Sequence, residues 1–273
     1  MPVPAPRSLS PSKVSAFTTC PLAFRFATID RIPEPATRHT ALGTLVHRAL
    51  EGLFWDHPAG KRTPDVAHDE LHRAWPVLAA DPEVAALGLG KEEADALLAE
   101  ASGLLDHYFA LEQPDTVQAV ATEIVLEADV GGVRLRGIID RLDREPDGSL
   151  TVVDYKTGRV PSPASEQARL AGVQIYALLC QEVLGQRPSR VRLLYLRGPV
   201  SIEAVPTDQQ VTGVQRRTAA LWSAITRACD TEDFRPRPSP LCNWCHFRPA
   251  CPAHGGDPAD VATLAAPGRT RLA

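Results

Sequence analysis

The sequence predicts an α/β protein, because segments with the helical period of about 3.6 residues are mixed with segments that alternate with the period of a strand. Helical patterns precede, separate and follow the strand patterns. A chain of 273 residues, 44% of them hydrophobic and 23% charged, can bury a full core in one large domain or two small ones. The strand patterns cover residues 117–129, 132–144, 150–156 and 191–197.

The helical patterns begin close to the N-terminus. Residues 1–8 are rich in proline and are expected to form a disordered arm. Ser10 followed by Pro11 is typical of a helix start, with Ser10 as the N-cap. The next helix, about residues 40–54, carries His47. Further helices are predicted at 66–80 and 91–112, within a helical insertion at about 56–115, and at 165–184 and 207–229.

One predicted hairpin carries most of the chemistry. Pro146-Asp147-Gly148 separates two β-branched apolar runs, and an Asp-Gly pair in that position is a strong hairpin signal. A three-residue loop with a positive φ at Gly148 places Asp140 opposite Asp154. Side chains alternate along a strand, so Asp154 and Lys156 project from the same face.

Two carboxylates and an ammonium group would then converge on one patch. Burying three charges without purpose is costly, whereas a divalent metal and a phosphate satisfy them all. Carboxylate oxygens suit Mg²⁺ or Mn²⁺, which polarises a phosphoryl oxygen and lowers the pKa of a water. Lys156 would orient or help to deprotonate that water. The alternative is a surface hairpin that binds nothing, and the apolar flanks Ile138-Ile139 and Val152-Val153 argue against it.

His47 is a metal ligand only if its helix lies against the hairpin; otherwise it is a packed core histidine. Tyr176, on the helix after the hairpin, is expected in the core. Gln174, two residues earlier and therefore on another helix face, is expected in solvent.

The cysteines form a second constellation. Cys242-x2-Cys245-x5-Cys251 lies in a proline-rich segment, residues 235–252, and this spacing is typical of a metal site. A fourth ligand could be Cys20, Cys180, Cys229 or His246. Cys180 and Cys229 have apolar helical neighbours and resemble core residues, whereas Cys20 lies in a loop. Four sulfurs alone do not distinguish zinc from an iron–sulfur cluster.

Together these residues resemble the RecB-like exonucleases of the PD-(D/E)XK nuclease superfamily, and most closely the branch with a cysteine-ligated cluster. That branch includes the AddB nuclease domain and the CRISPR-associated single-strand exonucleases. The resemblance runs in order over residues 9–252. It rests on five motifs: Ser10-Pro-Ser-Lys-Val-x3-Thr-Thr-Cys20-Pro, Gly43-Thr-Leu-Val-His47, Gly137-x2-Asp140-Arg, Asp154-Tyr-Lys156 and the three late cysteines.

The resemblance implies a PD-(D/E)XK core with a mixed central sheet flanked by helices, in a single nuclease domain over residues 9–252. It implies metal binding by His47, Asp140, Asp154 and the Tyr155 carbonyl. It also implies a 4Fe–4S cluster on Cys20, Cys242, Cys245 and Cys251, with Zn²⁺ as the alternative. Gln174, Tyr176 and Arg141 are candidates for DNA contact or support; the family has glutamine four residues before the tyrosine, where this chain has Gly172.

Composition and motifs also bear on the localisation and the partners of the protein. There is no run of 18 apolar residues and no apolar stretch near the N-terminus, so a cytoplasmic protein without a membrane span is expected. A net charge of −4 does not indicate nucleic acid, but a local basic groove that includes Arg25, Arg141 or Arg197 would suffice. No Gly-x4-Gly-Lys-Ser/Thr motif occurs, so a helicase motor would come from a separate subunit. Residues 253–273 are expected to be a disordered tail.

The function predicted from the sequence is therefore a metal-dependent deoxyribonuclease: an exonuclease acting on single-stranded DNA ends in repair or recombination. The alternative is a non-catalytic iron–sulfur subunit that binds DNA within a helicase–nuclease complex. A missing motif residue would favour that alternative, and Asp140, Asp154 and Lys156 are all present.

Overall fold

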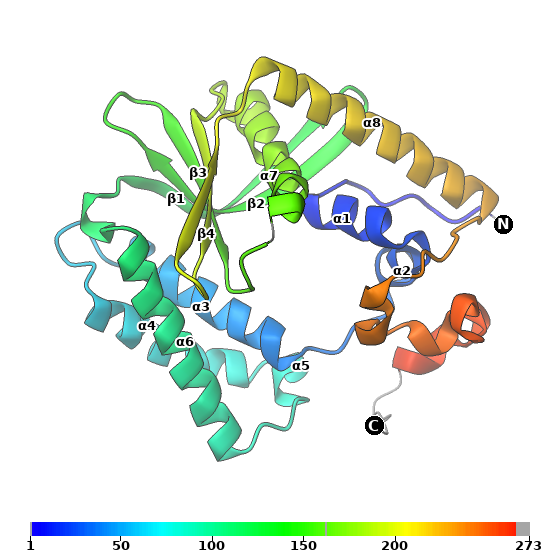
Figure 1. Cartoon of the computed structure of the whole chain (residues 1–273), viewed down its shortest axis with the longest axis horizontal. Coiled ribbons are helices and arrows are strands. Elements are labelled where there is room, and N and C mark those ends of the chain that lie inside the picture. The colour runs from blue at the N-terminus through cyan, green and yellow to red at the C-terminus, as the bar shows by residue number, and fades with distance from the viewer. Residues whose placement is uncertain (1, 162, 266–273) are drawn as a thin grey trace. The chain divides into compact units, whose positions relative to one another are not determined.

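The computed structural model describes residues 2–161 and 163–265 (Figure 1). The chain divides into two compact units. Unit 2 contains residues 36–128 and 136–214, and unit 1 contains residues 1–35, 129–135 and 215–273. The expected single domain, residues 9–252, includes parts of both. None of the helices in the described part of the chain is both long enough and apolar enough to cross a membrane.

A five-stranded sheet is the centre of the fold, in the order β1-β2-β3-β4-β5. β2 and β3 are antiparallel, β3 and β4 parallel, and β4 and β5 antiparallel. The sheet is therefore mixed, as expected. The strands are β1 (Ala119–Val130), β2 (Val133–Arg144), β3 (Leu150–Lys156), β4 (Arg190–Tyr195) and β5 (Val200–Ala204). The sequence patterns located the first four, but β5 was missed.

The register of the predicted hairpin is confirmed. Arg141 pairs with Val153 and Arg144 with Leu150, so the next pair outward along the ladder is Asp140 and Asp154. At the turn, the Glu145 N–H donates to the Ser149 carbonyl at 2.8 Å. Gly148 has a φ of 84°, the left-handed conformation that favours glycine.

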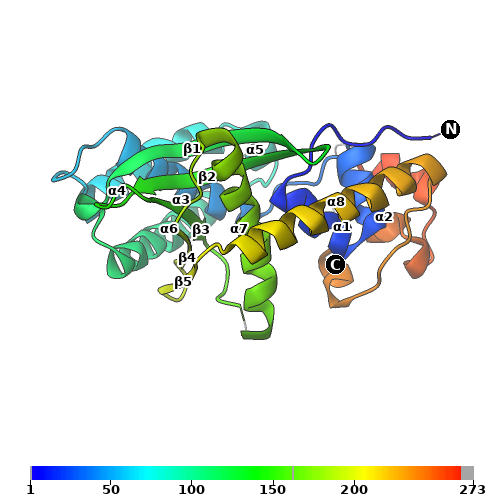
Figure 2. The ribbon, with the colours of Figure 1, turned by 90° about the horizontal axis from the view of Figure 1, so that it is seen from above.

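Helices cover the sheet of unit 2 (Figures 1 and 2). The insertion packs on one face, where its buried apolar side chains form a common core with Val153, Tyr155 and Leu194 of the sheet. Residues 150–155 of β3 are all buried, which means that both faces of this strand are covered. The helices are α3 (Arg38–Trp55), α4 (Pro64–Ala79), α5 (Pro82–Ala85) and α6 (Lys91–Leu111) on the insertion side, and α7 (Pro163–Leu184).

In unit 1, Ser10 caps α1 (Pro11–Thr19) as predicted, its hydroxyl accepting from the Lys13 N–H at 3.3 Å. Segments distant in sequence meet here. Phe26 lies 5.4 Å from Phe247 between ring centroids. The Val3 N–H donates to the Cys229 carbonyl, so the expected disordered arm is hydrogen-bonded within this unit. The remaining elements are α2 (Pro21–Phe24), a π-helical turn (Arg25–Ile29) and most of α8 (Asp208–Thr231).

The C-terminal segment is organised as short 3₁₀ turns, at Pro240–Trp244, Arg248–Ala250, Pro252–His254 and Pro258–Ala265. Turns this short suit a proline-rich chain, because proline lacks the N–H that longer helices need. The tail expected to be disordered from residue 253 is thus turned as far as residue 265, and residues 266–273 lie outside the described residues.

Candidate active site

Three elements of unit 2 bring together three of the four predicted metal ligands: His47, Asp140 and the Tyr155 carbonyl. His47 on α3 is 3.6 Å from Asp140 on β2, measured from Nδ1 to Oδ2. Its other ring nitrogen is 3.2 Å from the Tyr155 carbonyl oxygen on β3. The Tyr155 N–H in turn donates to Asp140 Oδ2 at 2.7 Å. The helix α3 does lie against the hairpin, which was the condition for His47 to be a candidate metal ligand.

Asp154 and Lys156 project from the same face of β3, as alternation predicted. The Lys156 ammonium is ion-paired with Asp154 Oδ2. That oxygen is buried and receives no hydrogen bond of good geometry among the described residues. The cation beside this oxygen is the Lys156 ammonium.

A fourth donor, Glu123 on β1, was missed by the sequence reasoning. Its carboxylate is 3.9 Å from His47 Nδ1. Within the described residues, His47, Glu123 and Asp140 form the group whose ligand atoms all lie within 4.8 Å of one another. Glu123 has a φ of 46° inside a strand, so the backbone departs from regular alternation there. Strain of this kind collects at functional sites.

The electrostatics favour a bound cation. Burial and the neighbouring charge of Asp154 raise the pKa of Asp140 well above its usual range. Burial, Glu51 and Asp154 raise the pKa of Glu123. Carboxyl groups held this close resist ionising together unless a positive charge compensates them. Mg²⁺ or Mn²⁺ fits this mixture of carboxylate, carbonyl and imidazole donors.

The pKa values of His47 and Lys156 are shifted in opposite directions. Burial lowers the pKa of His47 below its usual value, so its imidazole is neutral at pH 7 and can act as a ligand. Burial alone would also lower the pKa of Lys156, but the charges of Asp154 and Asp140 outweigh it and raise that pKa. The Lys156 ammonium can orient a water or offset charge on a phosphate.

A hollow of about 560 Å³ opens beside these donors. Of the candidate ligands, His47 and Glu123 line it. Arg48 lies on its wall, one helical position after His47, and is a cation that the sequence reasoning did not single out. The hollow is lined by Gly43, Thr44, His47, Arg48, Glu51 and Glu123.

The helix α7 contributes buried side chains. Tyr176 is buried as expected, with 8% of its surface exposed. Gln174 is equally buried, so the expectation that it is solvated was wrong. The reason is that every residue from 174 to 180 is buried, and this part of α7 has no solvent face. Gly137 on β2 lies under the helix: a Cβ there would be 2.8 Å from Tyr176 Cε1.

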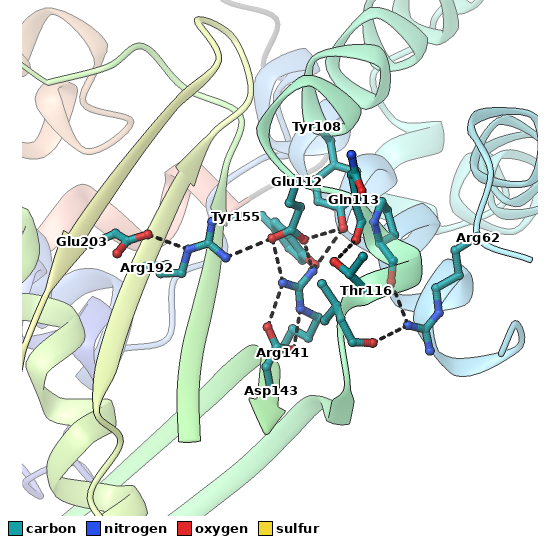
Figure 3. Close-up of polar contacts among 12 residues, drawn as sticks. Arg62, Tyr108, Glu112, Gln113, Thr116, Arg141, Asp143, Tyr155, Arg192 and Glu203 are labelled. Carbon is teal, nitrogen blue, oxygen red and sulfur yellow. Dashed lines mark hydrogen bonds and ion pairs between the residues drawn. The ribbon is translucent and has the colours of Figure 1, made fainter. Parts of the chain in front are cut away.

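Arg141 does not face DNA, because its side chain is fully buried. Its guanidinium donates to Asp143 Oδ1 at 2.8 Å and to the Tyr155 hydroxyl at 2.7 Å. It also pairs with Glu112, just beyond the end of α6, at 2.5 Å (Figure 3). Arg141 was considered for DNA contact or for support of the site, and its buried position is compatible only with support.

The other two arginines considered for phosphate binding already have partners. Arg197 donates to Glu100 at 2.6 Å and to the Thr157 carbonyl at 3.2 Å. In unit 1, Arg25 pairs with Asp30 at 3.3 Å. Both are partly exposed, so a phosphate would have to compete with these contacts.

The four cysteines of the second constellation line one cavity of unit 1, with a volume of about 100 Å³. The cavity contains Cys20, Cys242, Cys245 and Cys251. Two of the sulfurs accept backbone hydrogen bonds: Cys20 Sγ from the Arg237 N–H at 3.5 Å, and Cys242 Sγ from the Ser239 N–H at 3.3 Å. Such bonds stabilise a ligating thiolate.

The remaining cysteines are core residues, as predicted. Cys180 and Cys229 are 0% and 1% exposed and do not line the cysteine cavity. Burial raises the pKa of the Cys180 thiol to about 12.

A mixed sheet that presents an Asp-x-Lys strand beside a second aspartate and a helical histidine defines a class of metal-dependent nuclease. The chain matches the PD-(D/E)XK nuclease superfamily over residues 8–252, and it belongs to that superfamily. Nucleases of this superfamily use divalent metal ions.

The chain is also similar to individual proteins. The Gene 69 protein of Mycobacterium phage D29 is 24% identical over 266 residues, covering 89% of this chain and 96% of its own length. One subunit of the ATP-dependent helicase/deoxyribonuclease of Streptococcus mutans is 28% identical over 167 residues, or 58% of this chain and 15% of the length of that relative. A proposed exonuclease from Eubacterium rectale has the same fold, with a TM-score of 0.54, 10% identity and 88% of each chain covered.

Proposed function

We propose that the protein is a metal-dependent exonuclease that hydrolyses phosphodiester bonds at single-stranded DNA ends. The observation that carries the proposal is the set of contacts around His47 and β3: His47 lies 3.6 Å from Asp140 and 3.2 Å from the Tyr155 carbonyl oxygen, and Lys156 is ion-paired with Asp154. A divalent cation held there supplies Lewis acidity for a phosphoryl oxygen and for the attacking water.

The chain's own residues would then have separate roles. Asp140, Asp154 and His47 hold the cation, and Glu123 adds a fourth donor. The Lys156 ammonium orients the water and offsets charge that develops on the phosphate. Arg48, on the wall of the hollow, is placed to contact a neighbouring phosphate.

The experiment is degradation of end-labelled single- and double-stranded DNA with Mn²⁺, Mg²⁺ or EDTA. Labels at either end report the polarity. We expect metal-dependent loss of the single strand that disappears in Asp154→Asn. Asp147→Asn is the matched control, because Asp147 lies in the turn of the same hairpin, is exposed and caps the Ser149 N–H at 2.9 Å, which asparagine can also do. Wild-type protein that binds DNA without cutting it would instead favour the non-catalytic subunit.

We also propose that Cys20, Cys242, Cys245 and Cys251 hold a 4Fe–4S cluster. A tetrahedral zinc ion places its sulfurs about 3.8 Å apart, given Zn–S bonds of ~2.3 Å. Among the described residues, no three of these sulfurs lie mutually within 4.8 Å. The cavity of about 100 Å³ is also several times the ~10–15 Å³ that one water needs. Both features support a larger group than a single ion.

Metal and sulfide analysis of anaerobically purified protein tests the cluster. We expect iron and sulfide in equal amounts, lost in Cys245→Ser but retained in Cys180→Ser, which removes a buried thiol outside the cavity. Zinc in place of iron would contradict the 4Fe–4S cluster but would still make the four cysteines a metal site.

The partial likeness to a helicase/deoxyribonuclease subunit supports a further part of the proposal, that a separate motor supplies single strands. Adding a helicase to the reaction should allow the protein to degrade double-stranded DNA that it does not degrade alone. If the helicase does not change the degradation of double-stranded DNA, a separate helicase subunit is not part of the function.

A further inference from the structure

An ion network, buried at Arg141 and Glu112 and exposed at Glu203, lies on the insertion side of β2 and β3 (Figure 3). Glu112 is its centre: it accepts from Arg141 on β2 and from Arg192 on β4, the latter at 3.1 Å. Arg192 continues to Glu203 on β5 at 3.0 Å. The network therefore spans the sheet from β5 to β2 and is tied to the end of α6.

Tyr155 connects this network to the metal ligands. Its hydroxyl accepts from Arg141 Nη1 at 2.7 Å. Its backbone belongs to the site, because its N–H donates to Asp140 and its carbonyl oxygen is 3.2 Å from His47 Nε2. One residue thus has its side-chain tip in the network and both its peptide groups at the ligand set.

The side chain between these two ends is rigid. Tyrosine has only two χ angles, and this ring packs edge-on against Tyr108 and His47, with centroids 5.9 Å apart in both cases. Arg141 is held by further partners: Asp143, Glu112 and the Phe54 ring, 4.3 Å from its Cζ. Fixing the hydroxyl therefore fixes the orientation of the peptide groups of residue 155.

We propose that Arg141 and the Tyr155 hydroxyl act as a positioning pair, which orients the backbone of residue 155 so that Asp140, His47 and the Tyr155 carbonyl are preorganised for a divalent cation. This inference rests on the proposed function. Neither residue's side chain touches the substrate. Groups that orient metal ligands typically change metal affinity by 10–100-fold when they are removed.

The test compares two variants that each delete one buried hydroxyl. Tyr155→Phe breaks the bond to Arg141 and keeps the ring. Tyr108→Phe is the matched control, because the Tyr108 hydroxyl lies in the same network, 3.2 Å from Arg141 and 2.5 Å from Glu112, but belongs to α6. Mn²⁺ binding is measured without DNA, by calorimetry and by the Mn²⁺-induced rise in Tm.

We expect both variants to lose similar stability, since each removes one buried hydrogen-bonding group. Only Tyr155→Phe should weaken Mn²⁺ binding, by about tenfold. Arg141→Lys should show the same weakening, because lysine keeps the charge but lacks the guanidinium fork. DNA cleavage by Tyr155→Phe should recover at raised Mn²⁺, which a merely destabilised protein would not do.

Equal Mn²⁺ affinity in wild type, Tyr155→Phe and Arg141→Lys would overturn the positioning role and leave the nuclease proposal standing. Equal weakening in Tyr108→Phe would also overturn it, because the effect would then belong to the whole network. Wild-type protein that binds no Mn²⁺ would overturn both proposals.

Discussion

Gly137 can be tested by adding a single methyl group. It lies on β2, three residues before Asp140, where side chains of α7 pack against the strand. A Cβ at this position would be 2.8 Å from Tyr176 Cε1 and 2.9 Å from Leu179 Cδ1. Carbon atoms in ordinary contact are about 3.5–4.0 Å apart, so Gly137→Ala requires the helix side chains to retreat by roughly 0.6–1.2 Å.

The size of the effect follows from two opposing terms. Overpacking a tight contact costs about 1–3 kcal/mol, and three close atoms place this position in the upper half of that range. Replacing glycine with alanine returns about 0.4–1 kcal/mol by restricting the unfolded chain. The expected net loss is about 1–2.5 kcal/mol. At ~2–4 °C per kcal/mol for a chain of this size, Tm should fall by roughly 2–10 °C.

Thermal unfolding followed by circular dichroism measures this loss, and Gly103→Ala is the control. Gly103 lies inside α6, and a Cβ there would meet nothing within 4 Å. Alanine is the better helix former by about 0.5–1 kcal/mol, so Gly103→Ala should raise Tm by roughly 1–4 °C. The same substitution should therefore change stability in opposite directions at the two sites.

A second variant checks the mechanism. Leu179→Ala alone should cost about 2–5 kcal/mol by leaving a cavity. In the Gly137→Ala background it should cost less, because the new methyl group fills part of that space. A Gly137→Ala variant that melts at or above the wild-type temperature, or two substitutions whose stability losses are simply additive, would rule out overpacking at this contact.

Three further predictions concern charge. Burial alone would raise the pKa of Glu112, but Arg141 and two hydrogen bonds outweigh it and hold that pKa below the usual 4.5. The stability lost in Glu112→Gln should therefore be constant above about pH 4.5 and shrink as the pH falls through the folded-state pKa, as melts from pH 3 to 7 would show. Glu123→Gln removes one of the mutually repelling carboxylates, so it should raise the Tm of the metal-free protein. It should also reduce the increase in Tm that Mn²⁺ causes. An unchanged Mn²⁺-induced increase in Tm would exclude Glu123 as a ligand. Arg48→Gln should weaken single-stranded DNA binding and lower its dependence on salt by about one phosphate contact, and an unchanged salt slope in a titration series would exclude that contact.

Much of the sheet could be predicted because its signals are local. The Pro146-Asp147-Gly148 turn fixed the register of β2 and β3, and with it the pairing of Asp140 with Asp154. β5 was missed because Val200–Ala204 is a short edge strand that only its pairing with β4 stabilises. Gln174 was misplaced for a related reason, since helical periodicity cannot reveal a segment that is buried on every side.

The candidate site was predictable only where residues follow a regular spacing. Asp154 and Lys156 share a face by alternation. The contact of His47 with the hairpin needed the tertiary packing of α3. Glu123 lies within a correctly predicted strand, but no spacing links it to the hairpin, and only the structure places its carboxylate 3.9 Å from His47. Arg141 was considered for DNA contact because charge normally indicates exposure, and only the structure reveals Glu112, Asp143 and Tyr155 around its guanidinium.

The placement of the four cavity cysteines has a consequence for synthesis of the chain. Cys20 leaves the ribosome early, but Cys242, Cys245 and Cys251 follow only after the whole of unit 2, whose last residue is 214. At about 5–20 residues per second, the sheet and its metal ligands would emerge roughly 2–7 s before the last cysteine. Until residue 242 emerges, Cys20 has none of its later partners, so unit 1 is completed last. A chain truncated before residue 242 can complete the sheet of unit 2 but not the cysteine site.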